Sequence, residues 1–243
     1  MASTSEIGHA KNVANFQDLI EFVTAYGATY NPSKNSLKLP QLIALKASAD
    51  ATLADVITKN TNYNNKVNER ITAFSGLKSL STRLVNALQT TDATTETIGN
   101  AKTFNRKMQG KKASSSQTPT DPNTPAPNTI STSQQSYDQQ IQHLAGIISI
   151  LESEPSYAPN EVDLQIATLT AKQAALTAKN SAVANAYTNV SNARIERDTT
   201  IYGTDEGLFD IAAEVKKYVK SAFGATSPQF AQVKAIEFTN KKR

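Results

Sequence analysis

The sequence predicts an all-α protein: a tandem duplication of a three-helix unit with one long helix each, packed as a pseudo-twofold helical bundle. Three observations predict this fold class. Apolar residues recur at spacings of three and four, only 9 Gly and 9 Pro interrupt the 243 residues, and the two halves resemble each other. With 39% hydrophobic residues, 7% aromatic residues and no Trp, the core must be built mainly from aliphatic side chains, which suits helices packed side by side.

A segment rich in proline, serine and threonine divides the chain. Residues 113–136 contain no periodic apolar residue and four prolines, namely Pro119, Pro122, Pro125 and Pro127. Such a composition cannot bury enough apolar surface to offset the entropy of ordering it, so the segment predicts a flexible linker. Residues 1–112 then form the first helical repeat and residues 137–243 the second.

The two flanks of this linker align without a gap. Residues 30–76 and 157–203 share fifteen identities in 47 positions, more than a shared bias toward Ala, Thr and Asn explains. The matches include Tyr30/Tyr157, Leu37/Leu164, Leu42/Leu169, Val56/Val183, Glu69/Glu196, Arg70/Arg197 and Gly76/Gly203. This alignment predicts that both repeats contain the same elements in the same order.

Helix one of each repeat is marked by an amphipathic stripe. Its apolar residues are Phe16, Leu19, Ile20 and Val23 in the first repeat and Leu144, Ile147, Ile148 and Leu151 in the second. It ends at the loops YGATYNP and EPSYAPN, because proline and the residue before it resist helical continuation. We expect Asn160 to cap the following helix and Pro40 to lie in a first turn.

Helix two is long, with a seam of period 3.5 that predicts supercoiling against neighbouring helices. The second-repeat seam runs from Val162 to Ile201, and the first-repeat seam from Leu42 to Phe74. Asn60 and Asn180 interrupt these seams, and we expect them to fix register and meet solvent, with a polar binding face as the alternative. At 1.5 Å per residue such a helix measures roughly 50–60 Å.

Helix three follows Gly76 or Gly203 and extends to about Thr91 or Phe223, where Gly224 is a typical C-terminal stop. After helix three we expect a basic tail in each repeat. In the second repeat, Ser227 and Pro228 indicate one more short helix to about Val233. Residues 234–239 alternate like a strand, although we favour a loop there.

The most specific polar feature is the pair of Glu-Arg dipeptides, Glu69-Arg70 and Glu196-Arg197, on the long helices. We interpret them as ion pairs to neighbouring helices that fix register. Loss of either arginine should then cost about 1–3 kcal/mol of stability. The alternative is a charged site for an anionic ligand at a pseudo-twofold axis between the repeats.

A short basic run ends each repeat. These candidate anion-binding tails are Arg106, Lys107, Lys111, Lys112, Lys241, Lys242 and Arg243. Clustered Lys and Arg can hold phosphates without sequence preference, but the runs lack interleaved aromatic residues, and solvated tails are the simpler interpretation.

Several classes of protein are excluded by composition. The absence of Cys excludes disulfides and thiolate metal sites, and only His9 and His143 are present, too few for a His-rich metal site. The isolated glycines form no phosphate-binding loop. No signal peptide is apparent, and the longest apolar stretch is far shorter than the ~18 residues a membrane helix needs. We therefore expect a cytoplasmic protein without membrane insertion, with signal-less export as the alternative.

The terminal segments TSEIGHAKNVANF (residues 4–16) and VKSAFGATSPQFAQVKAIEFT (residues 219–239) resemble the ends of a group of uncharacterised proteins of the Bacteroidota. The YNP and YAPNE loops resemble that group too. The resemblance implies a bacterial origin and no known activity, cofactor or catalytic residue.

The sequence holds no catalytic, metal-binding or cofactor motif, and we expect no cofactor. The favoured function is therefore a non-enzymatic structural or scaffolding protein that acts through protein–protein contacts or self-association. The net charge of +4 permits the alternative of a basic accessory protein that binds nucleic acid through its tails. An enzyme with an unrecognised site is a third hypothesis.

Overall fold

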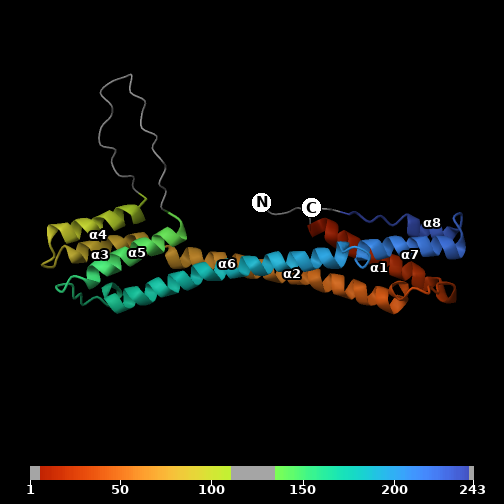
Figure 1. The fold of residues 1–243 in the computed structure, drawn as a ribbon, viewed down its shortest axis with the longest axis horizontal. Coiled ribbons are helices and arrows are strands. Elements are labelled where there is room, and N and C mark those ends of the chain that lie inside the picture. Colours follow the sequence, from red (N-terminus) through yellow and green to blue (C-terminus); the bar gives the residue numbers. More distant parts are fainter. Residues whose placement is uncertain (1–5, 111–134, 241–243) are drawn as a thin grey trace, which may run out of the picture. The chain divides into compact units, whose positions relative to one another are not determined.

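The computed structural model describes residues 6–110 and 135–240. Over these residues the chain forms eight α-helices and three short 3-10 helices with no strand, which confirms the all-α class (Figure 1). The α-helices are α1 (Glu6–Ala25), α2 (Leu39–Phe74), α3 (Leu77–Leu88), α4 (Thr95–Met108), α5 (Tyr137–Glu152), α6 (Ile166–Tyr202), α7 (Leu208–Phe223) and α8 (Pro228–Lys234). The 3-10 helices are η1 (Gly27–Thr29), η2 (Asn35–Leu37) and η3 (Val162–Leu164).

The chain folds into two compact units that do not follow its two halves. Among the described residues, the first unit takes those up to Tyr63 and from Ala186 onward, and the second takes Asn64 to Asn185. Both boundaries fall inside the long helices α2 and α6. Each unit therefore combines residues from both predicted repeats. Most of the predicted linker, residues 113–134, lies outside the described part of the chain.

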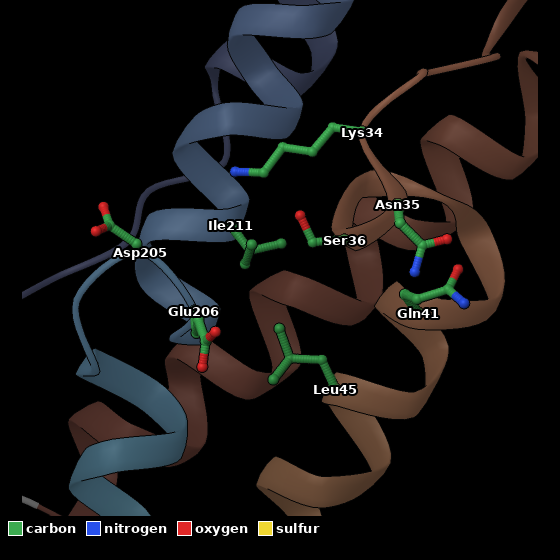
Figure 2. A pocket seen from close by; sticks show the side chains of 8 residues that line it. All are labelled: Lys34, Asn35, Ser36, Gln41, Leu45, Asp205, Glu206 and Ile211. Carbon is green, nitrogen blue, oxygen red and sulfur yellow. The ribbon is translucent and has the colours of Figure 1, made fainter.

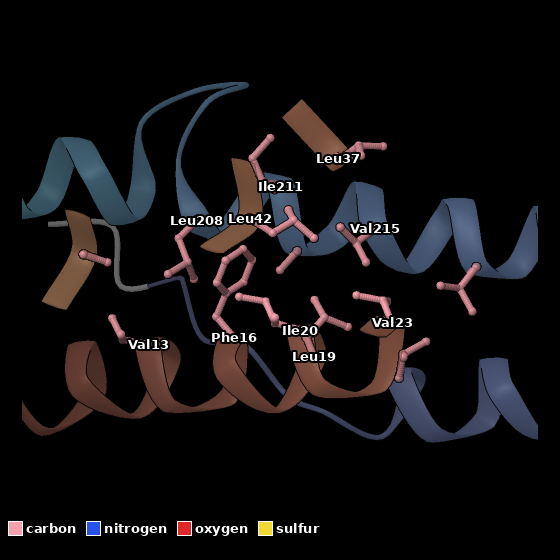
Figure 3. Packing of buried hydrophobic residues seen from close by; sticks show 14 of the residues in the cluster. Val13, Phe16, Leu19, Ile20, Val23, Leu37, Leu42, Leu208, Ile211 and Val215 are labelled. Carbon is pink, nitrogen blue, oxygen red and sulfur yellow. The ribbon is translucent and has the colours of Figure 1, made fainter. Parts of the chain in front are cut away.

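In the first unit, α1 packs against α7 and α8. The predicted stripe of α1 is fully buried or nearly so, and Figure 3 shows Phe16 and Ile20 directed toward the side of α7 that carries Leu208 and Val215. Leu37 and Leu42, from η2 and the start of α2, complete the same core. Helix one of the first half is therefore covered by helix three of the second half.

The second unit has the reciprocal arrangement. Here α5 packs against α3 and α4, and its predicted stripe is buried against the apolar side of α3. That side consists of Leu77, Leu80, Leu84, Val85 and Leu88. Neither half of the chain thus holds a complete core by itself. The reason is that each helix one finds its apolar partner in the other half.

The long helices follow most of the predicted seam. On α2, Leu42, Ala49 and Val56 are buried, and the remaining seam positions are at least partly covered. On α6 the seam is buried at Leu169 and at five later positions, but Tyr187 is 59% exposed. The predicted start at Val162 with an Asn160 cap is wrong: Val162 lies in η3, is 68% exposed, and α6 begins at Ile166.

The loop before each long helix is closed by one buried tyrosine. The Tyr30 hydroxyl donates to the Leu37 carbonyl at 2.7 Å, and the Tyr157 hydroxyl donates to the Leu164 carbonyl at 2.9 Å. Burial raises the pKa of both phenols, that of Tyr157 to about 12. Both tyrosines therefore remain neutral donors that tie the loop to the 3-10 helix at its end.

The first-half tail was predicted without a helix, and this prediction is wrong. Residues Thr95–Met108 form α4, which begins at Thr94, whose side chain accepts a hydrogen bond from the Thr97 amide. Ala101 and Met108 are buried in the second unit. The period-3.6 signal is weak because only a few apolar residues are spread over this helix, so the cap at Thr94 was the better indicator.

The C-terminal part of the second half agrees with prediction. Gly224 ends α7 with a φ of 94°, and the Ser227 side chain caps α8, with Pro228 in the first turn. Residues beyond α8 form no strand within the described chain. Instead Asn12 of α1 exchanges two hydrogen bonds with the Thr239 backbone, at 2.8 and 3.0 Å, as a neighbouring strand would.

Candidate functional site

The two predicted Glu-Arg pairs lie near the C-terminal ends of α2 and α6, each in its own unit. Glu69, in the second unit, accepts a hydrogen bond from Lys179 of α6 at 2.7 Å and another from Lys66 at 2.8 Å. Glu196, in the first unit, is exposed and forms no ion pair with any described residue. Only the first of the two glutamates therefore links its helix to a neighbour.

Arg70 contacts two neighbouring helices. Its Nη1 donates to Asn180 Oδ1 on α6 at 2.9 Å, and its guanidinium lies 4.0 Å from the ring centroid of Tyr137 on α5. Asn180 in turn donates to Asp138, so the predicted seam asparagine is part of this network. Cation–π contact and hydrogen bonding together orient the arginine. These contacts favour the register interpretation.

The electrostatics of Glu69 give a testable result. The hydrogen bond from Lys179, followed by that from Lys66, lowers the pKa of Glu69 from 4.5 to about 2. Because the folded pKa is below the unfolded one, the pair stabilises the fold above about pH 4.5, and this contribution is lost as the pH falls toward 2. An NMR titration of the Glu69 carboxyl should give a midpoint near 2, and Lys179→Gln should raise it.

The control for this titration is Lys59→Gln, which removes a lysine of α2 that pairs with Asp55 instead. This variant should leave the Glu69 midpoint unchanged. A midpoint that does not respond to Lys179→Gln would contradict the interhelical pair.

Arg197 is the largest fully buried side chain of the described chain. Its Nε and Nη2 both donate to Asp198 Oδ1, at 2.9 and 2.7 Å, and the Asp198 side chain is 34% exposed. A buried guanidinium is tolerated only when it is paired and hydrogen-bonded. Arg197 therefore acts as part of the core of the first unit.

A polar cluster near the end of α6 was missed by the sequence reasoning. Tyr202 OH lies 2.9 Å from His9 Nδ1 and receives a hydrogen bond from Asn12 at 3.1 Å. Burial raises the pKa of Tyr202, against a smaller lowering by Asn12. The only sequence signal was polar residues at His9 and Asn12 on the otherwise apolar side of α1. The cluster joins α1, α6 and the C-terminal segment in the first unit.

Of the predicted basic tails, Arg106 and Lys107 lie in the last turn of α4. Both are exposed, and the Lys107 ammonium lies 5.7 Å from the Phe104 ring centroid. Cations near the C-terminus of a helix interact favourably with its dipole. The other five tail residues, Lys111, Lys112, Lys241, Lys242 and Arg243, lie outside the described residues.

A groove of about 560 Å³ opens in the first unit between η2, the start of α2 and the turn before α7 (Figure 2). Within it the Ser36 hydroxyl and Gln41 Oε1 are buried and have no hydrogen-bond partner among the described residues. The residues that line it are Lys34, Asn35, Ser36, Gln41, Leu45, Asp205, Glu206 and Ile211. Asp205 has a φ of 64°, and its amide donates to Asp210.

The second unit has a groove of about 580 Å³ at the corresponding place, between η3, the start of α6 and α3. The residues that line it are Gly76, Ser79, Leu80, Arg83, Asp163, Thr168, Ala171, Lys172 and Ala175. The two grooves lie at corresponding places in the two units, but the charged and hydrogen-bonding residues that line them differ.

No family model, no curated protein and no solved structure matches this chain. Over residues 6–110 and 135–240, no group of three or more His, Asp or Glu side chains could hold a metal ion. No helix in the same ranges is long and apolar enough to cross a membrane.

Proposed function

We propose that this chain is a tandem duplication that serves as a non-enzymatic structural or scaffolding protein, acting through protein–protein contacts or self-association. The duplication is supported by features that occur twice at the same offset of 127 residues. These are the hydrogen bonds Tyr30–Leu37 and Tyr157–Leu164 and the 3-10 helices that follow them.

The scaffolding role is supported by large apolar side chains that remain exposed on α2. Ile43, Ile57 and Ile71 are 55%, 68% and 51% exposed. They are spaced by fourteen residues, which is two heptads, so all three occupy the same heptad position of α2. Single exposed apolar residues are ordinary, but a heptad spacing along a helix of 36 residues is typical of a surface that packs against another helix.

Self-association through this side of α2 can be measured by sedimentation at increasing protein concentration. We expect the parent chain to form assemblies heavier than the monomer, and the double variant Ile57→Gln/Ile71→Gln to shift the equilibrium toward the monomer by at least tenfold. The matched control is Thr61→Gln, at an exposed position of the same helix. A parent chain that remains monomeric at every protein concentration would contradict self-association. Scaffolding would then be tested by capture of a different protein partner.

The second candidate function is nucleic-acid binding through the basic tails. Its support within the described chain is the exposed pair Arg106 and Lys107 at the end of α4. Binding of this kind weakens steeply as salt rises, because phosphate contacts release counterions. Salt-dependent retention on DNA that is lost in the variant Arg106→Gln/Lys107→Gln would favour this function over scaffolding.

A further inference from the structure

One ion pair in each unit joins the loop before a long helix to a helix of the other half. In the first unit, Lys34 donates to Glu214 of α7 at 2.5 Å. In the second unit, Arg83 of α3 pairs with Asp163 of η3 through two hydrogen bonds. The two ion pairs occupy the same structural position, since each connects a 3-10 helix region to helix three.

The two pairs have opposite polarity. In the predicted alignment Lys34 matches Glu161, which lies two residues before Asp163. After four extra residues in the second repeat, Leu77, Leu80 and Leu84 match Leu208, Ile211 and Val215, and in this register Arg83 of α3 matches Glu214 of α7. Glu161 also acts on Arg83, because its charge contributes to raising the Arg83 pKa, after the larger effects of Asp163. Within the two ion pairs, the first repeat thus contributes only cations, and the second repeat only anions.

We infer that these charges select the pairing partner: the first repeat accepts a second repeat, from the same chain or from another copy, and rejects another first repeat. Two first repeats paired in the same manner would place Lys34 against Arg83. Two second repeats would place Glu161 and Asp163 against Glu214. The inference rests on the proposed duplication and not on the scaffolding role.

The physical need for such selection follows from the exchanged cores. Each helix one is covered by helix three of the other half, and both stripes consist of large apolar residues, aliphatic except for Phe16. Apolar faces of this kind discriminate weakly between partners, whereas contact between like charges disfavours the wrong partner. The ion pairs are partly exposed, with side-chain exposures between 31% and 55%. Changing one such contact from attraction to repulsion should alter a pairing equilibrium roughly fivefold, and two contacts roughly 25-fold.

The first test uses the full-length chain. Lys34→Glu and Glu214→Lys should each raise the unfolded fraction in denaturant titrations about fivefold, since each variant brings like charges together. The double variant Lys34→Glu/Glu214→Lys restores attraction and should return to within about twofold of the parent. Additive effects of the two substitutions would show that the contact is not coupled and would overturn the inference.

The second test measures directly which repeat each repeat pairs with. A protease site placed within residues 113–134 allows the linker to be cut, so that after unfolding and refolding the halves choose partners. Native mass spectrometry separates the three pairings by mass. The parent should reform pairs of one first and one second repeat. The variant Lys34→Glu/Glu214→Lys makes like repeats complementary at both contacts, and its like pairs should rise by roughly 10–50-fold.

Two controls complete this test. The full inversion Lys34→Glu/Arg83→Glu/Glu161→Lys/Asp163→Arg/Glu214→Lys again gives each repeat a single sign, so it should restore the parental pairing. The swap Lys46→Asp/Asp50→Lys reverses an ion pair within α2 and should change nothing. An unchanged share of like pairs in Lys34→Glu/Glu214→Lys would overturn the selection. That result would leave the scaffolding role standing, because sedimentation of the Ile57/Ile71 variant tests that role separately.

Discussion

Replacing Arg197 by Ala should lower the free energy of unfolding by about 2–4 kcal/mol. Arg197 is fully buried, and its guanidinium is paired with Asp198. The substitution leaves a cavity in the first unit and removes the counter-charge of a carboxylate that is only 34% exposed. Chemical denaturation monitored by circular dichroism measures the loss.

Arg70→Ala provides the matched control, because Arg70 occupies the aligned position of the other long helix. Arg70 is only partly buried, and its partners, Asn180 and Tyr137, are uncharged. Its loss should therefore cost less, about 1–2 kcal/mol. Arg197→Met, which refills part of the cavity, should recover part of the stability lost in Arg197→Ala. Equal losses of unfolding free energy in Arg197→Ala and Arg70→Ala would show that the burial of Arg197 does not determine the size of the loss.

Separation of the two halves should have a still larger effect: residues 1–112 alone should not give a stable monomer. In the intact chain the α1 stripe of Phe16, Leu19, Ile20 and Val23 is buried with α7, which belongs to the other half. Burial of each such side chain contributes about 1.5–3 kcal/mol. Loss of this cover from four side chains is comparable with the whole stability of a typical domain, about 5–15 kcal/mol.

The measurement compares the fragment alone with an equimolar mixture of residues 1–112 and 135–243. Alone, the fragment should show a broad thermal transition or should associate, whereas the mixture should regain cooperative unfolding. Cutting the intact chain within residues 113–134 is the control, because it breaks the same connection after folding and should leave the helical signal unchanged. A cooperatively melting monomer of residues 1–112 would contradict the exchanged cores.

The sequence by itself was sufficient for the all-α class and for most helices, because these depend on local signals. Apolar spacing predicted α1, α5 and the long helices, and Gly224, Ser227 and Pro228 predicted the end of α7 and the start of α8. It failed for α4, where apolar residues are sparse, and for the start of α6, where η3 takes the place of a first turn.

Only the tertiary structure decided which helices cover which. The stripes of α1 and α5 are nearly interchangeable in sequence, so nothing local shows that each packs against helix three of the other half. The same holds for the charged residues. Glu69 and Glu196 match in sequence, yet among the described residues only Glu69 pairs with a lysine of a neighbouring helix. Hydrophobic burial is non-directional. A periodic apolar stripe therefore predicts that a helix will be covered, but which helix covers it depends on long-range packing and charge.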